Sequence, residues 1–255
     1  MPLTIFSNAD FVQHFRALGL QNGDDVILHS KLTSFGLVPG GASSPFDALQ
    51  EVIGQRATIV VPTYCFQLSE KDIYDPMTTP SDNMGVISEY VRKLPNAVRS
   101  ACPIHNHSAI GDKASQLLQI DGNVSFGPNS DFAWLATHDF KLVLLGCGFF
   151  EAGTQAFHAM ASSGVPYREW RISSRKRRNQ NGSIEKIKVK YYARNNGELE
   201  DITLPENVLL SSGKIISINA PVGSSHAMRL HDYRSVCDNL LQANPNSFLK
   251  GYSNE

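Results

Sequence analysis

Three short apolar segments, spaced so that helices fit between them, constrain this chain more than any other feature. They are residues 25–29 (DVILH), 57–61 (ATIVV) and 141–145 (KLVLL). Each has the length of a buried strand, and proline or glycine follows the second and third segments closely. Strands separated by single helices predict an α/β fold, in which helices flank a mixed central sheet.

Helix signals lie between and around these segments. Ser7, with Asp10 three residues later, forms a capping-box pattern, and Phe11 and Phe15 follow at helical spacing. Ser43-Ser44-Pro45 predicts the start of a second helix over 46–53. We expect further helices at 87–94, 111–118, 154–162 and 236–241, a long ordered loop over 65–83, and a short extended piece at 97–100.

A basic β-hairpin insert is predicted between residues 168 and 194. Residues 184–192 (IEKIKVKYY) alternate apolar and charged side chains, which predicts a strand paired with 170–173 across a turn at Asn181-Gly182. The segment carries ten Lys or Arg and two Glu, a charge of +8, which leaves −9 for the rest of a chain with net charge −1. Such asymmetry favours an anionic partner, although a solvated hairpin is the alternative. No recognisable nucleic-acid module surrounds the segment, so no nucleic-acid partner is expected.

Length and composition predict one domain over residues 1–255, with 168–194 as a hairpin lobe within it. The longest apolar run, residues 142–150, is too short to cross a bilayer, and the first residues show no signal-peptide pattern. The four cysteines are scattered and form no CxxC pair. We therefore expect a cytoplasmic protein with no membrane partner, and homo-oligomer formation is left open.

Residues 29–42 (HSKLTSFGLVPGGA) follow a predicted strand and precede a predicted helix. Hydroxyls, backbone N–H groups and a helix N-terminus together suit an anion, so this loop predicts a phosphate-binding site. A purely structural surface loop is the alternative.

Three histidines are candidates for chemistry. His105 and His107 alternate, so they would face the same side of a strand, and His158 lies one turn after Thr154 in a predicted helix. No carboxylate with ligand spacing accompanies the pair, so no metal is expected. A neutral histidine needs only an orienting group to act as a general base, and simple burial is the alternative for each. A metal hydrolase and a nucleotide- or RNA-binding module remain as other classes.

Segments in a fixed order across nearly the whole chain resemble the aminoglycoside 3-N-acetyltransferase family. They are His29-Ser30, Ser34-Phe35-Gly36, Gly40-Gly41-Ala42, Pro62-Thr63, residues 75–80 (DPMTTP), Met84-Gly85, Glu89, residues 99–103 (RSACP), Ala109-Ile110-Gly111, residues 126–130 (FGPNS), Leu145-Gly146, residues 154–158 (TQAFH) and the C-terminal stretch 230–241. As a set, these motifs are fairly specific.

The resemblance implies acetyl transfer from acetyl-CoA to an amino group of a sugar, on the mixed α/β fold of this family. His158 would take the proton of the amine, since an ammonium group is not a nucleophile, and His107 is the second candidate. Backbone N–H groups near Ser108 or the glycine-rich loop would stabilise the oxyanion. The residues implied to bind CoA are His29, Ser30, Lys31, Thr33, Ser34, Phe35, Gly36, Gly40, Gly41 and Ser108.

The chain departs from the family pattern at its catalytic segments. Ala161 stands where many relatives have an acidic residue, Cys102 replaces a histidine, and His105 and His107 stand at small or polar positions. The carboxylate that orients the catalytic histidine is therefore open, with Glu89 and Asp75 as candidates.

The charge distribution points to an acceptor with phosphates. A polycationic aminoglycoside would avoid a segment of charge +8, whereas Arg and Lys suit a diphosphate. A subset of the family resembles enzymes that N-acetylate nucleotide-linked amino sugars for surface polysaccharide (O-antigen) synthesis. We therefore expect a dTDP-3-amino-3,6-dideoxyhexose acceptor, with an aminoglycoside antibiotic as the alternative. The residues expected to hold it are Asp75, Arg175, Arg177 and Arg178.

Overall fold

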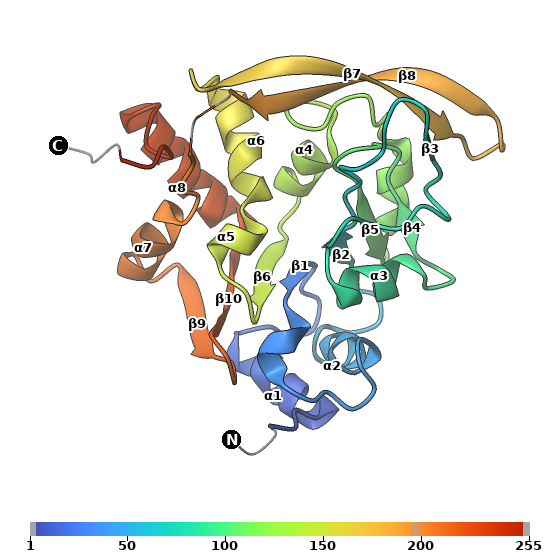
Figure 1. The fold of residues 1–255 in the computed structure, drawn as a ribbon. Coiled ribbons are helices and arrows are strands. Elements are labelled where there is room, and N and C mark those ends of the chain that lie inside the picture. The colour runs from blue at the N-terminus through green and yellow to red at the C-terminus, as the bar shows by residue number, and fades with distance from the viewer. Residues whose placement is uncertain (1–3, 196, 198, 252–255) are drawn as a thin grey trace.

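The computed structural model describes residues 4–195, 197 and 199–251. A seven-stranded mixed sheet forms its centre, in the order β4-β5-β2-β1-β6-β10-β9 (Figure 1). The strands are β1 (Val26–Ser30), β2 (Ile59–Pro62), β4 (Val98–Arg99), β5 (His107–Ile110), β6 (Lys141–Leu145), β9 (Ile215–Asn219) and β10 (Ser224–Arg229). β2, β1 and β6 run parallel, and the outer strands pair antiparallel. The predicted mixed α/β fold is therefore confirmed.

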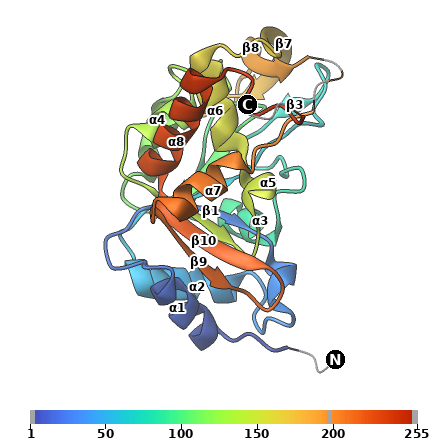
Figure 2. The ribbon, with the colours of Figure 1, turned by 90° about the vertical axis from the view of Figure 1, so that its left-hand side faces the viewer.

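Successive side chains of the central strands point to opposite faces of the sheet, so apolar residues form a hydrophobic core on each face. Val26 and Leu28 face the core of α1 (Asn8–Ala17), α2 (Ser43–Ile53) and α3 (Val86–Arg92). Ile27 faces the opposite core, to which α4, α6 and α8 contribute. Figure 2 shows α1 and α2 gathered at one end and α4, α6 and α8 at the other. The remaining helices are α4 (Asp131–Ala136), α5 (Phe149–Ala152), α6 (Thr154–Ser163), α7 (Leu204–Ser211) and α8 (Leu230–Ala243), with 3₁₀ turns at Leu32–Phe35 and Ala114–Gln119.

The predicted capping chemistry holds at α1 but not at α2, which begins at Ser43 itself, after Ala42, and has no side-chain cap. Ser7 accepts a hydrogen bond from the Asp10 backbone N–H, and the Asp10 carboxylate accepts from the Ser7 N–H, so the capping box is formed. The helix predicted over 111–118 is wrong: this stretch holds the 3₁₀ turn Ala114–Gln119. The C-terminal helix, α8, begins at Leu230, the first residue of the family-like stretch 230–241, and contains the predicted 236–241.

The strands of the basic hairpin are longer than the sequence pattern indicated. β7 (Arg168–Arg178) and β8 (Ile184–Arg194) pair over eleven residues each, and β3 (Ile73–Tyr74) adds a third strand beside β7. The hairpin lies across the end of the molecule that carries α4 and α6 (Figure 1). Val189 is buried on its inner face against Cys102 and Ile104, so the hairpin packs on the body. Among the described residues, no helix is long and apolar enough to span a bilayer.

Candidate functional site

A cleft of about 460 Å³ opens where β1 and β2 end. In α/β sheets, ligands bind at the carboxyl ends of parallel strands because the loops leaving those ends surround a shared space. This volume lies in the range of small-molecule sites. The residues that line the cleft are His29, Ser30, Lys31, Leu32, Thr33, Pro62, Tyr64, Phe66, Asn83, Met84, Gly85, Val86, Cys147 and Thr154.

Only the first part of the predicted phosphate loop reaches this cleft. His29, Ser30, Lys31 and Thr33 line it. The other predicted members have structural contacts instead: Ser34 Oγ donates to the Gly146 carbonyl at 2.6 Å, Phe35 packs in the core, Gly36 approaches the Thr4 backbone, and Gly40 and Gly41 lead into α2. Ser108 is fully buried, and its hydroxyl lies 3.2 Å from Thr63 Oγ1.

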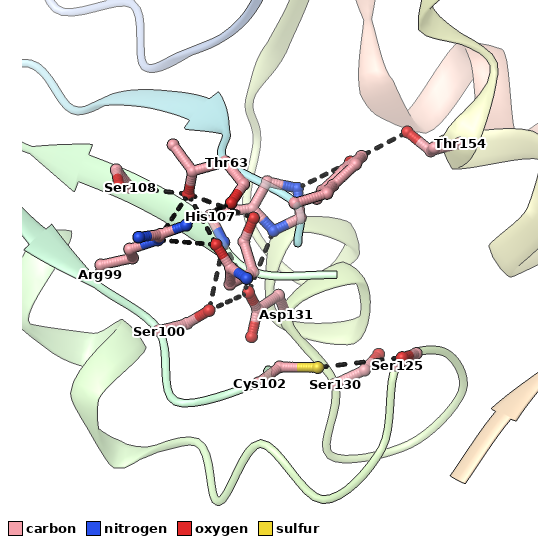
Figure 3. Close-up of polar contacts among 12 residues, drawn as sticks. Thr63, Arg99, Ser100, Cys102, His107, Ser108, Ser125, Ser130, Asp131 and Thr154 are labelled. Atoms are coloured by element: carbon pink, nitrogen blue, oxygen red, sulfur yellow. Dashed lines mark hydrogen bonds and ion pairs between the residues drawn. The ribbon is translucent and has the colours of Figure 1, made fainter. Parts of the chain in front are cut away.

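His107 and Asp131 form a buried histidine–carboxylate pair (Figure 3). His107 Nδ1 is 3.0 Å from Asp131 Oδ2, and neither side chain is exposed by more than 1%. The same carboxylate oxygen accepts the His107 backbone N–H at 3.1 Å and the Ser100 hydroxyl. Because a carboxylate only accepts, Nδ1 carries a proton, and Nε2 is an acceptor whenever the ring is neutral.

Two further side chains connect His107 to the cleft. Tyr64 Oη lies 3.2 Å from His107 Nε2 and 3.0 Å from Thr154 Oγ1, and both Tyr64 and Thr154 line the cleft. The sequence pointed to His107, but no pattern in it pointed to Asp131 and Tyr64 as its partners. Asp131 lies 24 residues from His107, at the start of a six-residue helix, and no local pattern connects the two.

His158 lies on α6, one turn after Thr154, as the sequence predicted. Its Nδ1 accepts the Gly127 backbone N–H at 3.1 Å, so a neutral ring carries its proton on Nε2. Burial, with the Arg234 charge as a second cause, lowers the pKa of His158 to about 3. Its ring stacks on Phe132, and it is not among the residues that line the cleft. In this arrangement, neither nitrogen of the neutral ring offers a free lone pair to a substrate proton.

Neither carboxylate that the sequence analysis considered contacts these histidines. Glu89 is held by Arg92 at 2.8 Å and by the Ser81 backbone N–H at 2.8 Å. Burial opposes its charge, but these hydrogen bonds outweigh the burial and lower the pKa of Glu89 to about 2. Asp75 pairs with Arg178 at 3.1 Å. The orienting carboxylate of His107 is instead Asp131.

The basic hairpin borders a second cavity, of about 820 Å³. Arg177, Arg178 and the hairpin turn line it opposite Asp75 and Met77, and its lining shares no residue with that of the first cleft. Arg177 also pairs with Glu185. Arg175 does not line this cavity; its Nη1 contacts Ser173 and Ser174. Asp75, Arg177 and Arg178, three of the four residues predicted to hold the acceptor, therefore line one cavity, and Arg175 lies outside it.

The described residues contain no group of three or more His, Cys, Asp or Glu that could hold a metal ion. The zinc-hydrolase alternative therefore has no ligand set in this part of the chain. The cleft at the strand ends, with the His107–Asp131 pair connected to it through Tyr64, has instead the features of a small-molecule site.

Comparison with known proteins identifies the family. The sequence profile of the aminoglycoside 3-N-acetyltransferase family matches residues 27–240. Aminoglycoside N(3)-acetyltransferase VII of Streptomyces paromomycinus is 33% identical over 169 residues, 59% of this chain and 58% of that protein. The crystal structure of aminoglycoside acetyltransferase AAC(3)-Xa has a TM-score of 0.84 at 20% identity, over 93% of both chains. A complex described as AAC-IIIb binary with CoASH has a TM-score of 0.81 at 18% identity, over 94% of this chain and 97% of that one.

This chain therefore belongs to the aminoglycoside 3-N-acetyltransferase family, as the sequence motifs indicated. The aligned part spans less than two thirds of the length of the Streptomyces relative. The solved structures share the fold of this chain.

Proposed function

We propose that this protein is an acetyl-CoA-dependent N-acetyltransferase that uses the His107–Asp131 pair to accept the proton of an amine. Family membership supports the reaction class. The single observation that carries the choice of base is the 3.0 Å contact between His107 Nδ1 and Asp131 Oδ2, because it makes Nδ1 the donor and leaves Nε2, 3.2 Å from the Tyr64 hydroxyl, to take up a proton. Of the three predicted catalytic residues, His107 thus fits the role better than His158 or Glu89.

The cleft fits the acetyl-pantetheine end of acetyl-CoA. His29 Nε2 is buried there without a hydrogen-bond partner among the described atoms, so an incoming amide or carbonyl group could satisfy it. Lys31 and Thr33 lie exposed on the same wall, where they would meet the more polar part of the molecule. We propose His29, Ser30, Lys31 and Thr33 as CoA-binding residues.

Relatives named for aminoglycosides favour an aminoglycoside amino group as the acceptor over the nucleotide-linked sugar that the charge argument preferred. The nucleotide-linked amino sugar is a second candidate because Arg177 and Arg178 line the 820 Å³ cavity. In that case the acceptor would have to compete with Glu185 and Asp75 for these guanidinium groups.

A thiol-release assay with acetyl-CoA tests the proposal, with kanamycin and a dTDP-linked 3-amino-3,6-dideoxyhexose as acceptors. Wild-type protein should release CoA with one of them. His107→Asn should bind acetyl-CoA with unchanged Kd and lose about 10²–10⁴-fold in turnover. Turnover with the nucleotide sugar alone would select the second candidate. Absence of acetyl-CoA binding by the wild-type protein would refute the reaction class.

A further inference from the structure

The two faces of the β7–β8 hairpin differ in how their charges are paired. Val189 lies opposite Ser173 and is buried against Cys102 and Ile104, so alternate residues on either side of this pair face the body. The residues between them face away from it. We call the following residues the outer face: Ile172, Ser174 and Lys176 on β7, Ile184, Lys186, Lys188 and Lys190 on β8, and Ile73, which pairs with Lys176 from the neighbouring β3.

Two arginines of the face toward the body have acceptors within the fold. Arg177 pairs with Glu185 and also donates to the Ala101 carbonyl at 3.1 Å. Arg171 pairs with Glu169 at 2.7 Å. The protein therefore compensates these positive charges itself, and the alternation of the strands separates them from the charges of the outer face.

The lysines of the outer face have no such partners. Among the residues that the structure describes, none of the four forms an ion pair with a carboxylate. Lys176 and Lys186 lie directly opposite each other, and like charges at such positions repel. Lys186, Lys188 and Lys190 are exposed. The outer face thus carries a concentrated positive charge that weakens the hairpin unless a negatively charged partner lies against it.

Exposed apolar side chains lie among these lysines. Ile172 is 66% exposed and Ile184 is 49% exposed, and Ile73 extends the apolar part onto β3. The lysines and isoleucines form one surface, because β3, β7 and β8 are hydrogen-bonded side by side. The hairpin forms the end of the molecule opposite α1 and α2 in both views (Figures 1 and 2). A partner can therefore reach the outer face without any movement of the body.

The chemistry of the outer face fits an anionic lipid surface. An ammonium group is a point charge without fixed hydrogen-bond geometry, so lysines suit many loosely arranged head groups, whereas arginine suits a single phosphate held by two hydrogen bonds. Isoleucines can enter the boundary of the acyl chains while the ammonium groups stay with the head groups. A nucleic acid strand would need free aromatic rings for stacking, and Lys190 Nζ already lies 4.4 Å from the centroid of the Trp170 ring.

We propose that the outer face docks this protein reversibly on a membrane surface that contains anionic phospholipid. The four lysines lie among the head groups, and Ile172 and Ile184 insert next to them. The proposal goes beyond the transferase function and does not depend on it, because no residue of the outer face lines either cavity. The expectation of no membrane partner rested on the lack of a spanning segment, which docking of this kind does not require.

Co-sedimentation with vesicles tests the proposal. Wild-type protein should sediment with vesicles of phosphatidylcholine that contain about one third phosphatidylserine, and pure phosphatidylcholine should bind it at least about tenfold more weakly. Salt at about 0.5 M should release most of the protein, because it screens the lysine charges. Equal binding to the two kinds of vesicle, or no binding to the anionic kind at low salt, would overturn the proposal.

Matched lysine variants locate the binding surface. Lys186→Gln combined with Lys188→Gln should lower the partition onto anionic vesicles by about tenfold or more, since each lysine near the surface contributes about fivefold. The control combines Lys93→Gln with Lys214→Gln, which removes the same charge from exposed lysines outside the hairpin. It should bind within about twofold of wild type. Equal losses in the two double variants would reflect net charge alone and would contradict docking through the outer face.

A fluorescent label reports the orientation of the bound protein without any assay of turnover. Ile172→Cys can be labelled selectively, because the four native cysteines are buried. The emission of a polarity-sensitive dye at position 172 should shift to shorter wavelength on anionic vesicles, and the same dye at Leu210→Cys, exposed on α7, should not shift. A shift at position 210 alone, or at neither position, would overturn the proposed orientation. Binding to a single-stranded RNA oligonucleotide but not to anionic vesicles would assign the outer face to nucleic acid and refute the proposal.

Discussion

His107 and Asp131 join the end of the sheet to a short helix through one carboxylate oxygen. Asp131 Oδ2 lies 3.0 Å from the His107 ring and 3.1 Å from the His107 backbone N–H. Ser130 caps α4 by accepting the Ala133 N–H, which places Asp131 in the first turn of that helix. The carboxylate therefore fixes both the tautomer and the orientation of the imidazole before any ligand binds.

Asp131→Asn should lower kcat by about 10²–10⁴-fold, because the neutral amide no longer stabilises the imidazolium that forms when His107 takes up a proton, even though its oxygen can keep the contact with Nδ1–H. Affinity for acetyl-CoA should stay unchanged, since Asp131 does not line the cleft. Steady-state kinetics and calorimetric titration measure the two effects. Turnover within about threefold of wild type in a folded Asp131→Asn protein would argue against this pair as the base.

His158→Asn should retain turnover within about tenfold of wild type. The asparagine Oδ1 can replace Nδ1 as acceptor of the Gly127 N–H, and the ring offers no free lone pair in the observed arrangement. The matched comparison is His107→Asn under the same assay conditions. A loss of 10²-fold or more in His158→Asn with unchanged CoA affinity would restore the assignment that the family motif implied.

Arg178→Gln distinguishes the two acceptor classes. If the hairpin cavity holds a diphosphate, the KM of the nucleotide sugar should rise about tenfold or more with little change in kcat, because one charge-assisted contact is lost. Arg229→Gln is the control, since Arg229 pairs with Asp139 at an exposed site outside both cavities. An unchanged KM in Arg178→Gln would leave the hairpin arginines with a structural role.

Stability should decrease as the pH falls below about 6.5. Burial lowers the pKa of His14 to about 4, so between pH 6.5 and 4 the unfolded chain binds a proton at His14 that the folded protein does not. The free energy of unfolding should therefore fall with decreasing pH, with a slope of at most about 1.4 kcal/mol per pH unit from this residue. In urea unfolding, His14→Gln, which can still accept from Ser225, should have a shallower slope; the exposed His231→Gln should not.

Gly111→Ala should destabilise the fold by about 3 kcal/mol or more. Gly111 has φ +115°, and a Cβ there would overlap the Ala57 carbonyl and lie 2.6 Å from Thr58 Cα. Gly164→Ala is the control, because Gly164 has φ +69° with open space around its Cβ position and should lose only about 1 kcal/mol. Chemical denaturation compares the two, and equal losses would contradict the steric argument.

The central elements could be predicted because their signals are local. The segment KLVLL is β6 as predicted, the helix over 154–162 is α6 within one residue, and the capping box at Ser7 is formed. β9 and β10 were missed, since β9 is mostly exposed and β10 (SSHAMR) carries no apolar alternation. They are strands because β10 pairs with β6 and β9 pairs with β10. Residues 111–118 were predicted as an α-helix but form a 3₁₀ turn instead. Here too a contact distant in sequence is decisive, because Gly111 has φ +115° and packs against the Ala57 backbone.

The amino-acid sequence by itself determined the α/β class, the family, the basic hairpin and the candidacy of His107, because periodicity, capping and motif order are properties of neighbouring residues. Tertiary structure alone decided which carboxylate meets which histidine. Asp131 reaches His107 across 24 residues, Tyr64 reaches it across 43, and Glu89 and Asp75 are occupied by arginines. Hydrogen-bond partners of a buried ring are set by which strands and helices pack together, and no spacing along the chain encodes that packing.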